Sequence, residues 1–130
     1  TAVVFQSITN QTSRFGVGDY NGDETDAIFG FKVVNGTLYA YIVDTPSDVS
    51  TEHTFEITGI DITHLHIYKA YFDASESTFY FYVDGVLKIT HIDDVPTALN
   101  NVIFAAFITN SANANKYMGV GYVLYSIKIN

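Results

Sequence analysis

Four tyrosines occupy alternate positions on two expected strands, and their rings could stack against sugars. Tyr39 and Tyr41 lie in one of these strands, and Tyr80 and Tyr82 lie in the other. Side chains alternate between the two faces of a strand, so each tyrosine pair shares the face opposite its apolar neighbours. A tyrosine has an apolar ring and a hydroxyl, which match the C–H face and the polar edges of a pyranose. We predict that the four form one functional surface for a glycan or a neighbouring subunit; the alternative is ordinary cross-strand packing.

The acidic stretch Gly18-Asp-Tyr-Asn-Gly-Asp-Glu-Thr-Asp26 has the spacing of a calcium-binding loop. Ca²⁺ prefers carboxylate and amide oxygens, and a short loop can place several of them around one ion. The stretch is similar to the calcium loops of integrin-type propeller repeats, although Glu24 stands where those loops have glycine. We therefore interpret it as a Ca²⁺ site, with an acidic turn between two strands as the alternative. The predicted ligands are Asp19, Asn21, Asp23 and Asp26.

His64 and His66 place two imidazoles on one side of a strand or its entry, a spacing that some zinc sites use. No third ligand can be identified from the sequence. Two histidines alone are more typical of an ordinary strand face than of a zinc site.

Two turn signals define the fold class. Asp84-Gly85 and Asn35-Gly36 each separate two runs of alternating apolar residues, the pattern of a two-residue hairpin with φ > 0 at both central positions. Short runs between turn signals continue along the chain, and no helical period interrupts them. We predict an all-β, antiparallel two-sheet sandwich in a single domain, residues 1–130. The expected strands are Ala2–Ile8, Ser13–Gly18, Ala27–Val34, Thr37–Asp44, Glu52–Thr58, Leu65–Asp73, Thr78–Val83, Val86–His91, Asn101–Thr109 and Lys116–Ile129.

The composition restricts the partners of this domain. The formal charge is −8 and the six Lys and Arg residues are scattered, so no basic stripe could follow a nucleic-acid backbone. There is no cysteine for a disulfide, and no apolar run long enough to span a membrane. A start at Thr1 rather than Met suggests a processed chain or a fragment. Ten Tyr and ten Phe exceed what one core needs, which favours a second covered surface and therefore a homo-oligomer or a larger assembly.

The second half of the chain resembles the concanavalin A-like lectin/glucanase superfamily, which includes the laminin-G-like domains. The resemblance rests chiefly on the hairpin Phe81-Tyr-Val-Asp-Gly85, preceded by His66-Ile-Tyr68 and followed by Thr90-His91. It implies a jelly-roll sandwich of the kind found in virus structural proteins, adhesins and polysaccharide-degrading enzymes. The glucanases of this superfamily carry Glu-x-Asp-x-Glu, whereas here Glu24-Thr-Asp26 is followed by Ile28. A lone pair of carboxylates cannot divide the two catalytic roles, so we predict no enzymatic activity.

From these observations we expect a non-catalytic, lectin-like module of an extracellular, cell-surface or virion structure, which binds glycan or mediates adhesion. The alternative is a structural subunit that self-assembles into a coat, spike or filament. The two functions share the fold and differ in what covers the tyrosine surface.

Overall fold

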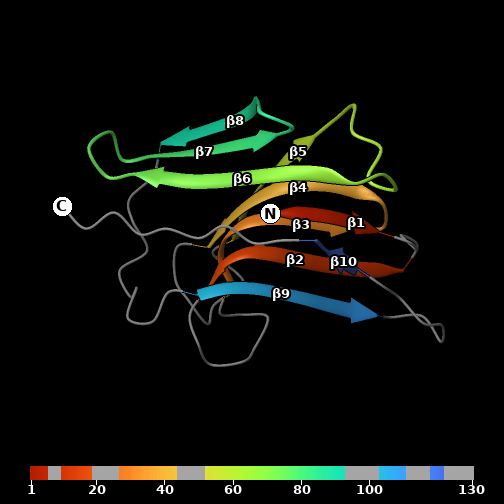
Figure 1. The fold of residues 1–130 in the computed structure, drawn as a ribbon. Coiled ribbons are helices and arrows are strands. Elements are labelled where there is room, and N and C mark those ends of the chain that lie inside the picture. The colour runs from red at the N-terminus through yellow and green to blue at the C-terminus, as the bar shows by residue number, and fades with distance from the viewer. Residues whose placement is uncertain (6–9, 19–26, 44–51, 93–102, 111–117, 122–130) are drawn as a thin grey trace.

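The computed structural model describes residues 1–5, 10–18, 27–43, 52–92, 103–110 and 118–121. All regular structure in these segments is β, as the sequence predicts, and the strands form two antiparallel sheets (Figure 1). Among the described residues, no helix has the length and apolar character needed to cross a bilayer.

Ten strands make up the two sheets. The first sheet has the order β10-β1-β6-β7-β8, and the second has the order β5-β4-β3-β2-β9. The strands are β1 Ala2–Phe5, β2 Gln11–Gly18, β3 Ala27–Val34, β4 Thr37–Val43, β5 Glu52–Ile57, β6 His66–Asp73, β7 Thr78–Val83, β8 Val86–Ile92, β9 Ile103–Asn110 and β10 Met118–Val120. Most bounds lie within two residues of the prediction. The first and last strands are the exceptions. The first was expected to extend to Ile8, whereas β1 ends at Phe5 and positions 6–9 lie outside the described segments. The last was expected over Lys116–Ile129, whereas β10 covers three residues and positions 122–130 lie outside the described segments.

Both predicted hairpins are confirmed by their backbone angles. Asn35 and Gly36 have φ of 50° and 91°, and Asp84 and Gly85 have φ of 52° and 76°. Positive φ at both central positions gives the turn the twist of its flanking strands. These turns fix the register, so that Phe31 lies opposite Ala40 in one hairpin and Phe81 lies opposite Ile89 in the other.

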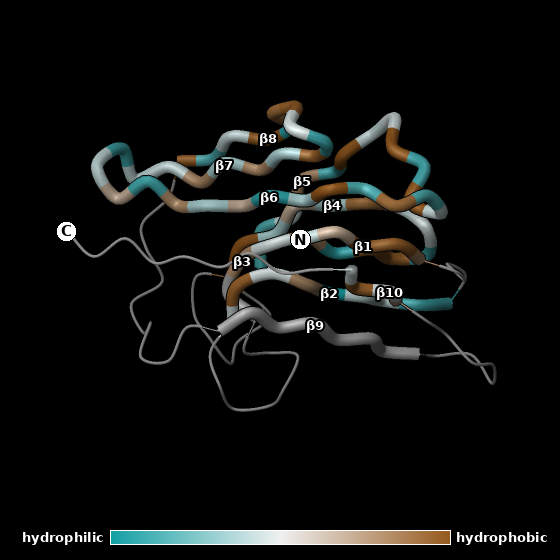
Figure 2. The backbone as a smooth tube through the Cα atoms, in the orientation of Figure 1, coloured by the Kyte–Doolittle hydropathy of each residue, from teal (hydrophilic) through white to brown (hydrophobic). Residues whose placement is uncertain are grey.

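The core lies between the two sheets. The inward residues of β4 and β7 pack in one cluster with aromatic rings from β1, β2, β3 and β6, which confirms the predicted core faces. Phe31 of one sheet meets Phe81 of the other edge-on, with ring centroids 5.7 Å apart. Figure 2 shows brown, apolar stretches along β1 and β3. The inward residues of the two hairpin strands are Leu38, Ala40, Ile42, Phe79, Phe81 and Val83.

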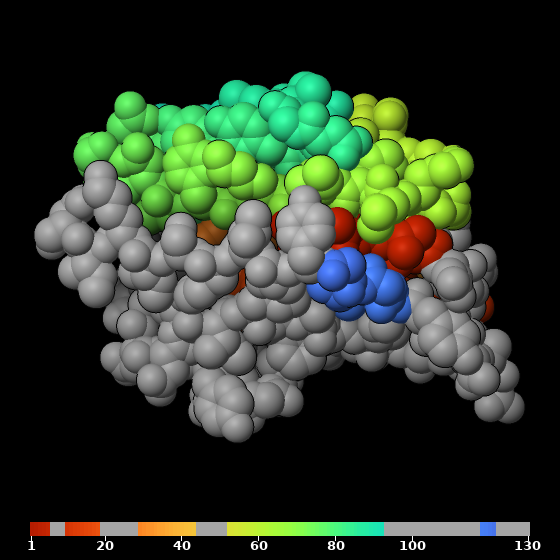
Figure 3. All heavy atoms as spheres, in the orientation of Figure 1, coloured from red at the N-terminus to blue at the C-terminus, as the bar shows by residue number. Residues whose placement is uncertain are grey.

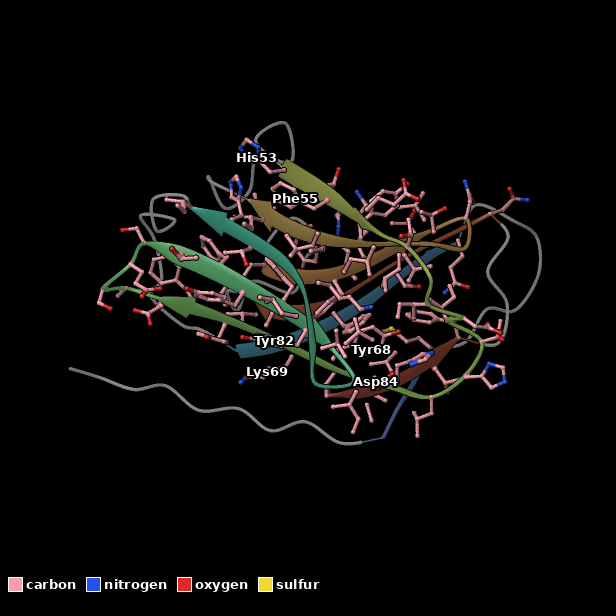
Figure 4. The ribbon with its side chains drawn as sticks, turned by 90° about the horizontal axis from the view of Figure 1, so that it is seen from above. His53, Phe55, Tyr68, Lys69, Tyr82 and Asp84 are labelled. Atoms are coloured by element: carbon pink, nitrogen blue, oxygen red, sulfur yellow. The ribbon has the colours of Figure 1, made fainter. Side chains whose placement is uncertain are left out.

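The edge strands β5 and β8 approach each other and cover one side of the core. His91 of β8 packs on Phe55 of β5, with ring centroids 4.6 Å apart, and lies near His53 (Figure 4). The ladder between β7 and β8 shifts register between Phe81 and Tyr82, which marks a bulge next to Lys88. A bulge and a lysine on an edge strand both oppose pairing with another strand edge. The β8 edge of this sheet is therefore unfavourable for pairing with another strand.

Candidate functional site

The strand order separates the four tyrosines that the sequence suggests as one surface. Tyr39 and Tyr41 lie on β4 of the second sheet, whereas Tyr80 and Tyr82 lie on β7 of the first. Both pairs point away from the core, because the residues between them belong to it. In a sandwich the two outward faces look in opposite directions. The four side chains therefore form two sites and not the single surface that we predicted.

Tyr41 also lacks the exposure that a surface for a glycan or a neighbouring subunit requires. Its side chain is 0% exposed and packs with Val43 in a small cluster separate from the main core. The guanidinium of Arg14 lies over its ring, 5.8 Å from the centroid. Burial raises the pKa of the Tyr41 hydroxyl far above its ordinary value, so the group stays protonated. Tyr41 is thus unavailable to a large ligand, and Tyr39 beside it is half-buried.

Tyr80 and Tyr82 belong to an aromatic row that also contains Lys69 and Tyr71 of β6. Lys69 lies opposite Tyr82, and Tyr71 lies opposite Tyr80 in the β6–β7 ladder. The Tyr71 ring stacks on Tyr80 at 4.9 Å and 16°, and on Tyr82 at 6.2 Å and 13°. The Lys69 ammonium lies over the rings of Tyr71 and Tyr82, at 4.9 and 5.1 Å from their centroids. We call Lys69, Tyr71, Tyr80 and Tyr82 the tyrosine row; Figure 4 shows Lys69 and Tyr82 side by side.

Hydrogen bonds hold the hydroxyl ends of the tyrosine row. The Tyr80 hydroxyl donates to a carboxylate oxygen of Glu76, which raises the pKa of Tyr80 to about 12. A hydrogen bond with Tyr82 raises the pKa of Tyr71. The hydroxyls of Tyr71 and Tyr80 are therefore neutral near pH 7. Lys69 and Tyr71 were missed at the sequence level, although their alternation with Tyr68, Ala70 and Phe72 places them outward.

Several exposed apolar side chains lie on the same sheet as the tyrosine row. The described residues include six large hydrophobic side chains that are exposed, and all of them belong to the first sheet or to the loop before β6. Leu87 lies opposite Tyr82 in the β7–β8 ladder. Figure 2 shows apolar colour at both ends of β8, and Figure 3 shows β6 to β8 as one continuous green-to-teal surface. The six residues are Leu65, Ile67, Val86, Leu87, Ile92 and Val120.

The two histidines considered for zinc make other contacts. His66 Nδ1 lies 2.7 Å from Asp84 Oδ2, and Nε2 lies 2.8 Å from the carbonyl oxygen of Asp61. His64 lies in the preceding loop, 3.1 Å from the Asp61 carboxylate. Within the segments that the structure describes, no group of three or more His, Cys, Asp or Glu residues is placed to hold a metal. The predicted calcium ligands Asp19, Asn21, Asp23 and Asp26 lie outside those segments.

Three comparisons with known proteins, against family models, curated proteins and solved structures, found no match.

Proposed function

We propose that this chain is a non-catalytic, lectin-like module that binds neutral glycan on the outer face of β6 to β8. The observation that supports this function is the tyrosine row itself. Its rings stack on one another and carry a fixed ammonium group, so they offer a preorganised array of hydroxyls and one cation. The jelly-roll topology, the superfamily resemblance and an extracellular, cell-surface or virion location belong to the same proposal.

The chemistry of the row suits a sugar in two ways. The Tyr80 hydroxyl, which donates to Glu76, can accept a hydrogen bond from a sugar hydroxyl, and the ammonium of Lys69 can donate one. The exposed side chains of Leu87 and Ile67 add apolar surface on either side, against which a pyranose can place its C–H face. A face of aromatic and apolar groups with a few fixed polar groups is typical of ligand sites.

A glycan array with the wild type and two variants tests this function. Tyr80→Ser combined with Tyr82→Ser should abolish binding while the melting midpoint stays close to wild type, since both rings are only partly buried. Lys69→Met should weaken binding, whereas Lys88→Met, the same charge change outside the tyrosine row, should not. An array without saturable signal, or unchanged binding by the double variant, would overturn the proposal.

Self-association is the second candidate function for this face, and the exposed apolar side chains of Ile67, Leu87 and Ile92 favour it. Light scattering with size-exclusion chromatography distinguishes the two. A stable dimer or larger species that becomes a monomer in Leu87→Ser with Ile92→Ser supports assembly. A wild-type monomer that still binds sugar supports the lectin-like function.

A further inference from the structure

The outer face of the second sheet carries charged side chains that are mostly buried. Arg14 of β2 and Lys32 of β3 are neighbours in the ladder, and both reach Glu52 of β5. Arg14 Nη2 lies 2.5 Å from Glu52 Oε2, and Lys32 Nζ lies 2.5 Å from Oε1. The three side chains are 10, 17 and 7% exposed. A buried ionic group of this kind is stable only where its charges are compensated.

A pair of glycines gives these long side chains room. Gly16 and Gly30 face each other across β2 and β3, two residues further along the strands than Arg14 and Lys32 in the direction of Glu52. A Cβ at either glycine would lie 2.3 Å from a backbone oxygen of the other strand, so no side chain fits there. Arg14 and Lys32 can therefore extend over a flat strip of backbone.

Among the residues that the structure describes, the charges of this group do not cancel. Two cations share one carboxylate, and each oxygen of Glu52 is already bonded to one of them. Among the described residues, neither Nε of Arg14 nor the hydroxyl of Tyr41 has a hydrogen-bond partner, although both atoms are buried. A buried polar atom without a partner is costly, and native proteins keep few of them. Counted over the described residues alone, the site thus has one positive charge in excess and two hydrogen-bonding groups without a partner.

A hollow of about 170 Å³ opens beside this group. Its described lining is Lys32, Val34, Tyr39 and Thr54. Thr54 lies opposite Tyr41 in the β4–β5 ladder, and Tyr39 lies opposite Lys32 in the β3–β4 ladder. The hollow is smaller than the roughly 300–1,000 Å³ of pockets for drug-sized ligands, so it suits a single ring or a group of similar size.

We propose that this hollow binds a carboxylate-bearing ligand of monosaccharide size. The ligand's carboxylate accepts hydrogen bonds from Lys32, which uses one of its three donors for Glu52. The Thr54 hydroxyl bonds a polar edge of the ligand, and the half-buried Tyr39 ring covers its apolar side. This site lies on the opposite side of the sandwich from the tyrosine row and is independent of it.

One exposed carboxylate opposes the ligand. Glu56 lies opposite Tyr39 in the β4–β5 ladder, and its side chain is exposed. Its repulsion acts through solvent, where charge interactions are weak and screened by salt. Removal of this charge should therefore strengthen binding modestly, and more at low ionic strength.

Titration with D-glucuronate, with glucose as the ligand that lacks a carboxylate, tests the site by NMR and calorimetry. We expect saturable shifts at Lys32, Tyr39 and Thr54 with glucuronate and none with glucose. Lys32→Met should weaken binding about tenfold or more, the effect of one lost charge-assisted hydrogen bond. This variant leaves Arg14 and Glu52 as a neutral pair, and a thermal melt verifies its fold.

Glu56→Gln should tighten binding, and Lys88→Met on the other sheet should leave it unchanged. Acetate distinguishes a simple anion site from a site for a sugar acid: binding equal to that of glucuronate would show that the ring adds nothing and would overturn the size assignment. Absence of saturable shifts with glucuronate, or equal binding by wild type and a folded Lys32→Met variant, would overturn the site itself.

Discussion

His66 Nδ1 lies 2.7 Å from Asp84 Oδ2, so the first residue of β6 is bonded to the turn between β7 and β8. Asp84 Oδ1 also accepts the backbone N–H of Ile67 at 2.9 Å, and the Asp84 N–H donates to the Ile67 carbonyl at 2.8 Å. The other ring nitrogen of His66 meets the Asp61 carbonyl. Both ring nitrogens face oxygen acceptors, so only the doubly protonated imidazole satisfies both.

These contacts predict how stability depends on pH. The Ile67 N–H, and next the His66 ring, lower the pKa of Asp84; this contribution is lost as pH falls through the lowered value. Burial alone would lower the pKa of His66, but its bonds to Asp84 and Asp61 outweigh burial and raise it. The histidine contribution is complete below about pH 6.5 and is lost as pH rises through the raised value. The His66–Asp84 contact therefore stabilises the fold most at pH values between the ordinary pKa of a carboxyl group and that of an imidazole.

Asp84→Asn tests the His66–Asp84 ion pair. Asparagine tolerates the positive φ and keeps an acceptor for the backbone N–H of Ile67, so the substitution removes only the charge. We expect a loss of about 0.5–1 kcal/mol near pH 5.5, the range of partly exposed ion pairs. The loss should shrink toward pH 8, where His66 is neutral in both proteins. Urea unfolding at several pH values measures this difference, and a loss that is constant over the range would contradict the assignment.

Gly85 supports a second prediction, which isolates backbone conformation from packing. Its φ is 76°, and a Cβ at this position would contact nothing within 4 Å. Gly85→Val should therefore destabilise the domain by about 1–3 kcal/mol through φ alone, because a β-branched residue resists the left-handed region. Gly85→Asn adds a side chain that accepts positive φ and should cost less. Equal losses in the two variants would show that exposure of the turn, not φ, sets the effect.

Local pattern predicted much of this fold but not the site. Period-two alternation placed Phe81 and Leu38 inward, and the Asp-Gly and Asn-Gly turns fixed both hairpins, because each feature depends on neighbours in the chain. The distribution of the tyrosines depends on strand order, which alternation does not encode. Burial of Tyr41 depends on Arg14, 27 positions earlier, and the stack at Tyr82 depends on the β6–β7 register.

Calcium binding by the Asp19–Asp26 stretch remains a prediction from the sequence. If these oxygens hold Ca²⁺ in the folded state alone, the ion should raise stability by RT ln(1 + [Ca²⁺]/Kd). A thermal melt with millimolar calcium and with EDTA measures this shift. Replacement of Asp19 and Asp23 by Asn should remove the shift, and an equal midpoint in calcium and EDTA would exclude the site.

The buried charge group on the second sheet gives the last prediction. Glu52→Gln removes the carboxylate that both Arg14 and Lys32 contact, so two mostly buried cations lose their compensation. Loss of one partner from a buried ionic group costs about 3–5 kcal/mol, and the partial exposure of Lys32 favours the lower end. Glu56→Gln makes the same change at an exposed position on the same strand and should stay within about 0.5 kcal/mol of wild type. Chemical unfolding of both variants provides the comparison.

Lys32→Met added to Glu52→Gln should recover part of the stability, since one uncompensated cation is then gone. Equal stability of the Glu52 and Glu56 variants would show that solvent already compensates Arg14 and Lys32, and that their excess charge exerts no demand for an anion.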